Sequence, residues 1–240
     1  ELLARTTVAS HSLGSDRDTL LMSLSDSDGT KFSDSSFMRG KLGVTSRANT
    51  TSFRNSVLEG DLRYYNVLGP KYLGDRYVGR HTLVASLSAD LGHNLDLDKE
   101  FLLGATSGLR GYKDRTFVGV HRFVMNFEER IHMYEDLYKV MSLGGALFCD
   151  VGGTSYNGIG DIISDNLYTD VGFGFRLGFP RSSGGGIVRI DIAFPLRDGP
   201  DGTSVGEPRL LITTGQIVSA GLPQESSQSP GSNVAVSFLP

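Results

Sequence analysis

The sequence predicts an all-β fold: an antiparallel transmembrane β-barrel of about eight to ten strands, interrupted by one long loop that the family resemblance described below places in the lumen. Three observations lead to this prediction. Apolar and polar residues alternate with a period of two in many segments, several of them longer than ten residues. The chain has no run of about 18 apolar residues that could form a transmembrane helix. One long segment without alternation, residues 93–115, interrupts the series.

The clearest alternation lies in residues 167–179. Its odd positions read Leu, Thr, Val, Phe, Phe, Leu and Phe, whereas its even positions read Tyr, Asp, Gly, Gly, Arg and Gly. Successive side chains of a strand point to opposite faces, so the two faces of this strand must meet different environments. The same pattern returns in residues 58–64, 82–91, 123–131 and 188–194.

About ten segments of this kind follow one another along the chain, with connectors rich in Gly, Asp and Asn between them. They lie near residues 3–12, 18–26, 35–48, 52–66, 77–92, 116–133, 139–152, 167–179, 186–196 and 208–218; the first two alternate most weakly. We expect residues 1–218 to form the barrel, or the C-terminal part of a larger barrel. Residues 219–240 are rich in Ser, Pro and Gly and are expected to form a flexible tail.

A soluble β-sandwich that acts as a binding module is the alternative fold, because its strands also alternate. Opposite charges recur in the middle of the polar faces, while Phe, Ile and Leu fill the other faces. A barrel with a polar lumen and a lipid-facing exterior explains both faces. We therefore favour the barrel.

The composition excludes several functions. The formal net charge is −4 and no basic cluster stands out, so no nucleic-acid partner is expected. No nucleophile elbow, phosphate loop or zinc-ligand spacing occurs, so we expect no enzyme, no cofactor and no metal site. The single cysteine, Cys149, excludes an intramolecular disulfide. The chain begins at Glu1 without a methionine or a signal peptide, which is expected of a mature form or a fragment.

The candidate functional residues begin with the turn Leu109-Arg110-Gly111-Tyr112 in the long loop. A guanidinium group carries five donors in a rigid fork and can engage two carboxylates at once. Gly111 permits a tight turn and close approach, and Tyr112 can pack while its hydroxyl forms a hydrogen bond. A solvated loop arginine is the alternative interpretation of Arg110.

Polar residues in the inward phase of the predicted strands are the second group of candidates. The acids Glu128 and Asp150 fall on the polar faces of two consecutive strands. The other residues expected to face the lumen are Asn126, Arg130, Asp170, Arg176, Arg189 and Asp191.

The order of these motifs resembles the C-terminal barrel region of the BamA and two-partner-secretion (TpsB) superfamily of outer-membrane proteins. The resemblance covers residues 100–218 well and residues 35–92 loosely. It is carried by the Leu-Arg-Gly-Tyr turn at 109–112, Asn-Phe-Glu-Glu-Arg at 126–130, Phe-Cys-Asp-Val-Gly at 148–152, Gly-Phe-Gly-Phe-Arg at 172–176, Arg-Ile-Asp-Ile-Ala-Phe-Pro-Leu at 189–196 and Ile-Thr-Thr-Gly-Gln at 212–216.

This resemblance implies that the loop folds back into the lumen, where Arg110 pairs with Asp150 and Glu128 is the second acid. It also implies a bacterial or organellar outer membrane, with the lipid bilayer and client outer-membrane or secreted polypeptides as partners. The expected function is the insertion or translocation of polypeptides at that membrane.

The chain departs from the family in length, because barrels of roughly sixteen strands preceded by transport-associated domains would need a longer sequence. If the chain is a fragment, the missing strands precede Glu1. If it is complete, the barrel is smaller or is shared between the chains of a homo-oligomer. A closed barrel of eight to ten strands would have a filled lumen and could not pass a polypeptide. The family's terminal aromatic residue is also absent after Gln216.

These departures leave two further functions open. The barrel could anchor an upstream enzymatic domain, such as a patatin-like domain, or another upstream domain. It could also be a short structural barrel without transport.

Overall fold

The computed structural model describes residues 1–15, 18–49, 52–137, 141–179 and 187–214. One antiparallel sheet of ten strands, in the order β1-β2-β3-β4-β5-β8-β9-β10-β11-β12, makes up most of the fold. Its strands are β1 (Leu2–Ala9), β2 (Thr19–Lys31), β3 (Ser36–Ala48), β4 (Phe53–Leu73), β5 (Arg76–His93), β8 (His121–Leu137), β9 (Met141–Ser155), β10 (Tyr168–Gly178), β11 (Ile187–Pro195) and β12 (Arg209–Thr214). A two-stranded sheet, β6 (Phe101–Leu103) with β7 (Phe117–Gly119), a 3-10 turn (His11–Leu13) and the short helix α1 (Ile159–Ser164) complete it.

The ten strands of the large sheet coincide with the ten segments predicted from alternation, so the all-β antiparallel prediction is confirmed. Neighbours in the sheet are mostly joined by hairpins. The hairpin from β4 to β5 turns at Gly74 and Asp75, where Gly74 has a φ of 60°. Glycine fits this first position of a two-residue turn because it adopts positive φ without a steric penalty.

The predicted strand 116–133 is wrong in one respect, because it consists of two separate elements. β7 pairs with β6 in the small sheet, and the ladder of the large sheet resumes at β8. The break falls at Val120, whose N–H donates to the carbonyl of Ser155 while its own carbonyl accepts from Gly92. These two bonds satisfy the Val120 backbone outside either ladder. The 93–115 segment also contains a strand, β6, which the sequence did not predict.

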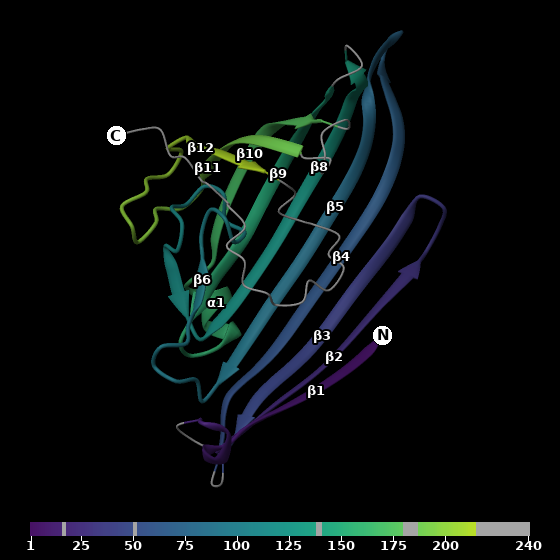
Figure 1. The fold of residues 1–240 in the computed structure, drawn as a ribbon. Coiled ribbons are helices and arrows are strands. Elements are labelled where there is room, and N and C mark those ends of the chain that lie inside the picture. Colours follow the sequence, from purple (N-terminus) through teal and green to yellow (C-terminus); the bar gives the residue numbers. More distant parts are fainter. Residues whose placement is uncertain (16–17, 50–51, 138–140, 180–186, 215–240) are drawn as a thin grey trace.

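The large sheet is strongly curved and, over the described residues, open. Among the described residues, β1 pairs only with β2 and β12 only with β11, so each of these two strands has one edge without a described partner. Figure 1 shows the strands side by side from β1 to β12, with β6 and α1 beside the C-terminal half of the sheet. The arrangement is a single curved sheet rather than the two face-to-face sheets of a β-sandwich. The predicted flexible tail, residues 219–240, lies outside the described residues.

The two faces of the sheet have the expected character. On the inner face, Val84 and Asp90 of β5 are buried. On the outer face, Phe127 and Leu147 are exposed to 45% and 52%, and Phe175 to 53%. Large apolar side chains from neighbouring strands are therefore exposed together on this face. Such a surface is unusual in water.

Candidate functional site

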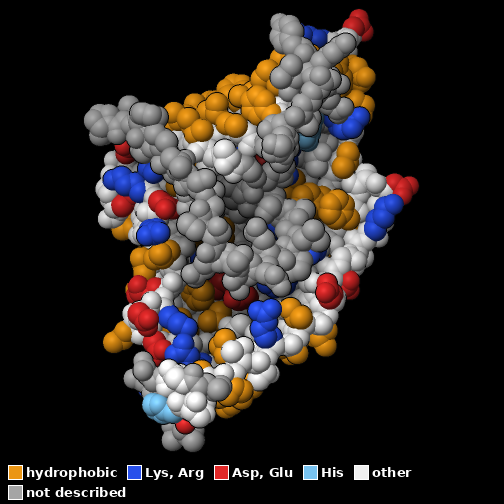
Figure 2. Space-filling view, in the orientation of Figure 1, with side chains coloured by type: hydrophobic (Ala, Val, Ile, Leu, Met, Phe, Trp, Pro, Cys, Tyr) orange, Lys and Arg blue, Asp and Glu red, His pale blue; other side chains and the backbone are white. Residues whose placement is uncertain are grey.

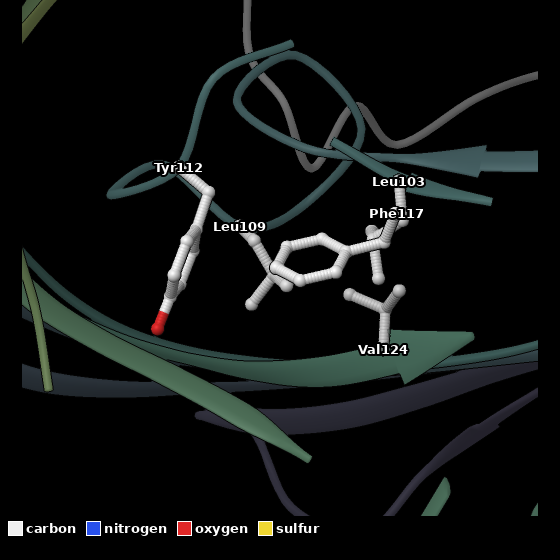
Figure 3. Packing of buried hydrophobic residues seen from close by; sticks show 5 residues of the cluster. All are labelled: Leu103, Leu109, Tyr112, Phe117 and Val124. Carbon is white, nitrogen blue, oxygen red and sulfur yellow. The ribbon is translucent and has the colours of Figure 1, made fainter. Parts of the chain in front are cut away.

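The segment between β5 and β8 folds into a compact loop over the inner face of the sheet. Five buried side chains form its hydrophobic centre, here called the loop core: Leu103, Leu109, Tyr112, Phe117 and Val124. Figure 3 shows Leu109 and Tyr112 pointing from the loop toward the strands, the Phe117 ring extending toward Leu109, and Val124 rising from β8 to meet them. Their burial removes apolar surface from solvent and fixes the loop against the sheet.

Arg110 follows Leu109 and points among the acids of the strands. Its Nε and Nη2 donate to the two carboxylate oxygens of Asp150 at 2.7 and 2.8 Å, a bidentate pair. Its Nη1 donates to Oε2 of Glu128 at 2.9 Å. The structure therefore brings together Arg110, Glu128 and Asp150, the three residues that the resemblance implied would meet.

Two more residues complete the surroundings of Arg110. Its guanidinium carbon lies 3.4 Å from the ring centroid of Phe148, a close cation–π contact. Asp191 of β11 lies 3.6 Å from Nη1. We refer to Arg110, Glu128, Phe148, Asp150 and Asp191 as the arginine site. The roles of Phe148 and Asp191 in it were not anticipated, since a strand pattern gives the face of a residue and not its partner across the sheet.

The arginine site is almost completely shielded from solvent. The Arg110 side chain is 2% exposed, and those of Glu128 and Asp150 are 4% and 0% exposed. Burial by itself lowers the pKa of Arg110, but the charge and hydrogen bonds of Asp150 outweigh it, so the pKa is raised and the group stays charged. Desolvation offsets much of the attraction in a buried ion pair. The arrangement therefore defines the position of the loop more than it adds stability.

Asn126 connects the loop backbone to the same carboxylate. Its Nδ2 donates to the carbonyl of Gly108 at 2.7 Å and to Oδ1 of Asp150 at 2.8 Å. The turn that carries Arg110 is thus held on its backbone as well as by its side chain.

Glycines on the inner face make room for these groups. A Cβ on Gly111 would lie 2.6 Å from Cβ of Asp170, so the tip of the loop approaches β10 as only glycine can. A Cβ on Gly172 would collide with the ring of Phe148, and one on Gly174 with the carboxylate of Asp191. The Gly-Phe-Gly-Phe-Arg motif therefore leaves space on its inner side while its phenylalanines point outward.

The remaining predicted lumen residues also lie on the inner face, near the arginine site. Arg130 Nε bonds to Glu128 at 2.8 Å, and Arg189 Nη2 bonds to Asp191 at 2.9 Å. Arg176 Nη1 forms an ion pair with the same Asp191 carboxylate. Asp170 is fully buried but forms no ion pair with any described residue.

Tyr112 holds the loop to the connection between β11 and β12. Its hydroxyl donates to the carbonyl oxygens of Thr169 at 3.2 Å and Arg197 at 2.9 Å. Burial, assisted by the nearby charge of Asp170, raises the pKa of Tyr112 to about 12. Nearby, Thr116 donates to Oδ2 of Asp201 at 3.1 Å. A hydrogen bond of the Tyr112 hydroxyl was predicted, but its partners and the contact between Thr116 and Asp201 were not.

A third attachment lies at the beginning of the loop. Asp96 accepts a hydrogen bond from Nδ2 of Asn55 at 2.7 Å and pairs with Arg47 and Arg54 at 3.3 and 3.4 Å. The Asn55 hydrogen bond, together with these two arginines, holds the pKa of Asp96 below its usual value. Asn55 has a φ of 50°, a conformation that asparagine tolerates better than most residues. No pattern in the sequence indicates that Asp96 attaches the loop, because an aspartate in a polar loop is usually exposed to solvent.

No protein-family model matches the chain, and no curated protein matches it significantly. No helix in the described ranges is both long and apolar enough to cross a membrane. Within the same ranges, no group of three or more His, Cys, Asp or Glu side chains is placed to hold a metal ion.

Proposed function

We propose that this chain forms the strands of an outer-membrane β-barrel of the BamA and TpsB type, which inserts or translocates polypeptides. One observation carries the proposal. An arginine in a Leu-Arg-Gly-Tyr turn is buried between Glu128 and Asp150, acids of two consecutive antiparallel strands, on the inner face of a long-stranded sheet.

The two faces of the sheet support placement in a bilayer. A strand tilted in a membrane needs about 9–11 residues to cross the hydrocarbon core. β9 and β10 have 15 and 11 residues, and their outer faces carry exposed apolar side chains such as Leu147, Phe173 and Phe175. Figure 2 shows hydrophobic side chains gathered along the upper rim of the molecule. Lipid is the solvent that makes such a surface favourable.

The free strand edges suggest how a client would be engaged. An unpaired edge offers a row of backbone donors and acceptors to an incoming strand. The loop makes its buried ion pairs with β8, β9 and β11, so this part of the sheet is held in one shape. Among the described residues, β1 and β2 make no ion pair with the loop, whereas β3 is joined to it by Arg47 and Asp96. In this proposal, the N-terminal edge is the part of the barrel that opens or pairs with a client.

Heat-modifiability of the detergent-folded chain tests the barrel. We expect the unboiled sample to migrate differently from the boiled sample in SDS gels, with a band position that reports whether one chain or several form the barrel. A chain that dissolves in plain buffer and shows no shift would contradict the proposal.

Client folding in liposomes tests the activity. Vesicles that contain the folded chain should accelerate the appearance of protease-resistant, folded outer-membrane protein relative to empty vesicles. A clear heat shift without any acceleration would contradict insertion activity and leave an anchoring barrel as the better account.

A further inference from the structure

Asp170 is a second buried acid beside Asp150. It is fully shielded from solvent, and in the ladder between β9 and β10 it lies directly opposite Asp150, the acid that binds Arg110. Residues opposite each other in an antiparallel pair have Cβ atoms about 4.5–5.5 Å apart. The two carboxyl groups therefore lie next to each other on the inner face of the sheet.

Asp150 has the partners that an ionised carboxylate needs. Its Oδ2 accepts a hydrogen bond from Nε of Arg110 at 2.7 Å, and its Oδ1 accepts one from Nη2 at 2.8 Å. Nδ2 of Asn126 donates a further bond to Oδ1 at 2.8 Å. Asp150 is therefore the charged member of the pair.

Asp170 has no comparable set of partners. No described side-chain N–H group forms a hydrogen bond with either of its carboxyl oxygens, and the backbone N–H of Gly111 faces it from the loop. The side-chain group within hydrogen-bonding reach is the carboxyl of Asp150. Arg110, the cation that acts on Asp170, is already bound to Asp150 and Glu128. A hydrogen bond between two carboxyl groups requires a proton on one of them.

The tip of the loop closes over Asp170. A Cβ on Gly111 would lie 2.6 Å from Cβ of Asp170, and the ring of Tyr112 is the other titratable loop group that faces it. Across the ladder between β10 and β11, its partner is Pro195, which carries no charge. The loop thus packs directly on this side chain, and a proton is the cation that needs no added space.

We propose that Asp170 holds a proton while the loop is attached and that loss of this proton detaches the loop. Two acids that share one site keep a proton between them, because two negative charges so close together repel each other. An ionised carboxylate without a cation is also costly to bury. Ionisation of Asp170 places a second negative charge beside Asp150, and detachment of the loop exposes that charge to water.

The attachment therefore weakens as the pH rises. The attached loop retains the Asp170 proton more firmly than the detached loop, in which Asp170 is an exposed aspartate. Because one proton is involved, the ratio of detached to attached loop rises at most about tenfold for each unit of pH. This proton-dependent attachment goes beyond the proposed function and operates whether or not the chain transports polypeptides.

Infrared spectroscopy of the folded chain in detergent micelles tests the proton directly. At about pH 7.5, where an ordinary aspartate or glutamate is ionised, we expect the carbonyl band of a protonated carboxylic acid. Asp170→Asn should remove this band; asparagine has nearly the same size and can still donate an N–H to Asp150. Asp61→Asn, which removes a carboxylate of β4 that pairs with Arg63, is the matched control and should leave the band unchanged.

Cleavage of the loop by proteinase K tests the detachment, with the boiled chain at each pH as the correction for protease activity. The range from about pH 7.5 to 10 lies below the titration of Tyr112, whose pKa is about 12. Cleavage within residues 93–115 should rise at least about tenfold over this range in the wild type and in Asp61→Asn. It should stay constant in Asp170→Asn.

A missing carboxylic-acid band would overturn the proposal, as would wild-type cleavage that does not respond to pH or responds as in Asp170→Asn. Should Asp170→Asn fail to fold by circular dichroism, the wild type decides alone. Its carboxylic-acid band must then disappear over the same pH interval in which cleavage rises. A band that persists through that rise would overturn the proposal.

Discussion

The guanidinium carbon of Arg110 lies 3.4 Å from the centroid of the Phe148 ring, while the edge of the same guanidinium binds Asp150 and Glu128. Stacking uses the flat face of the group and the carboxylates use its N–H donors, so the contacts do not compete. Gly172 provides the space into which the Phe148 ring extends. The position of the loop therefore depends on an aromatic residue as well as on acids.

Phe148→Leu should destabilise the folded chain by about 0.5–2 kcal/mol through loss of the cation–π contact alone. Urea unfolding in micelles, followed by circular dichroism, measures this change. Phe173→Leu is the matched control because Phe173 points outward and is 41% exposed. Equal effects of the two substitutions would argue against a specific contribution of the Arg110 contact.

Gly111→Ala should displace the loop tip, since the added Cβ would lie 2.6 Å from Asp170 and 3.1 Å from the backbone nitrogen of Pro195. Overpacking of this kind costs about 1–3 kcal/mol. The same unfolding assay measures it, with Gly160→Ala as control, because a Cβ there meets nothing within 4 Å and Gly160 lies in helix α1. A Gly111→Ala variant as stable as wild type would mean that the tip is not tightly seated.

The sequence predicted the sheet well because side-chain alternation is a local property. Glu128 and Asp150 could be assigned to the inner face from their phase alone, and both lie there. The contact of Phe148 with Arg110 could not be predicted. Alternation places Phe148 on the inner face with the acids, but it does not show which loop residue covers the ring. Asp96 could not be found either, because its partners Arg47 and Asn55 are more than 40 residues away in sequence.

Arg110→Ala and Asp150→Asn should not be additive. Each single change leaves a buried group without its partner, so the double variant should be less destabilised than the sum, with a coupling of roughly 0.5–3 kcal/mol. Unfolding free energies of the four proteins measure the coupling. Asp61→Asn, whose carboxylate pairs with Arg63, is the control partner and should be additive with Arg110→Ala. Additivity of the first pair would mean that Arg110 and Asp150 do not interact energetically.

Tyr112 should make the loop sensitive to alkaline pH. Its pKa is 10.0 as a free group and about 12 in the folded chain, so the folded state retains the phenol proton more strongly. Its contribution to stability is complete below pH 10 and is lost as the pH rises from 10 to about 12. Absorbance near 295 nm should show one tyrosine titrating late (~pH 12), which Tyr112→Phe removes and Tyr72→Phe, at an exposed site, does not. Loss of the late phase in Tyr72→Phe instead would contradict the assignment.

Protease protection of the loop in Arg110→Ala tests the central claim most directly. The substitution leaves Glu128 and Asp150 buried without their cation, a loss of about 3–5 kcal/mol that acts on loop attachment. With chymotrypsin, which does not require arginine, cleavage within residues 93–115 should accelerate at least about 100-fold. The β-sheet circular dichroism should be retained, and Arg115→Ala, at an exposed loop arginine, should stay protected. Unchanged protection in Arg110→Ala would show that the arginine site does not hold the loop.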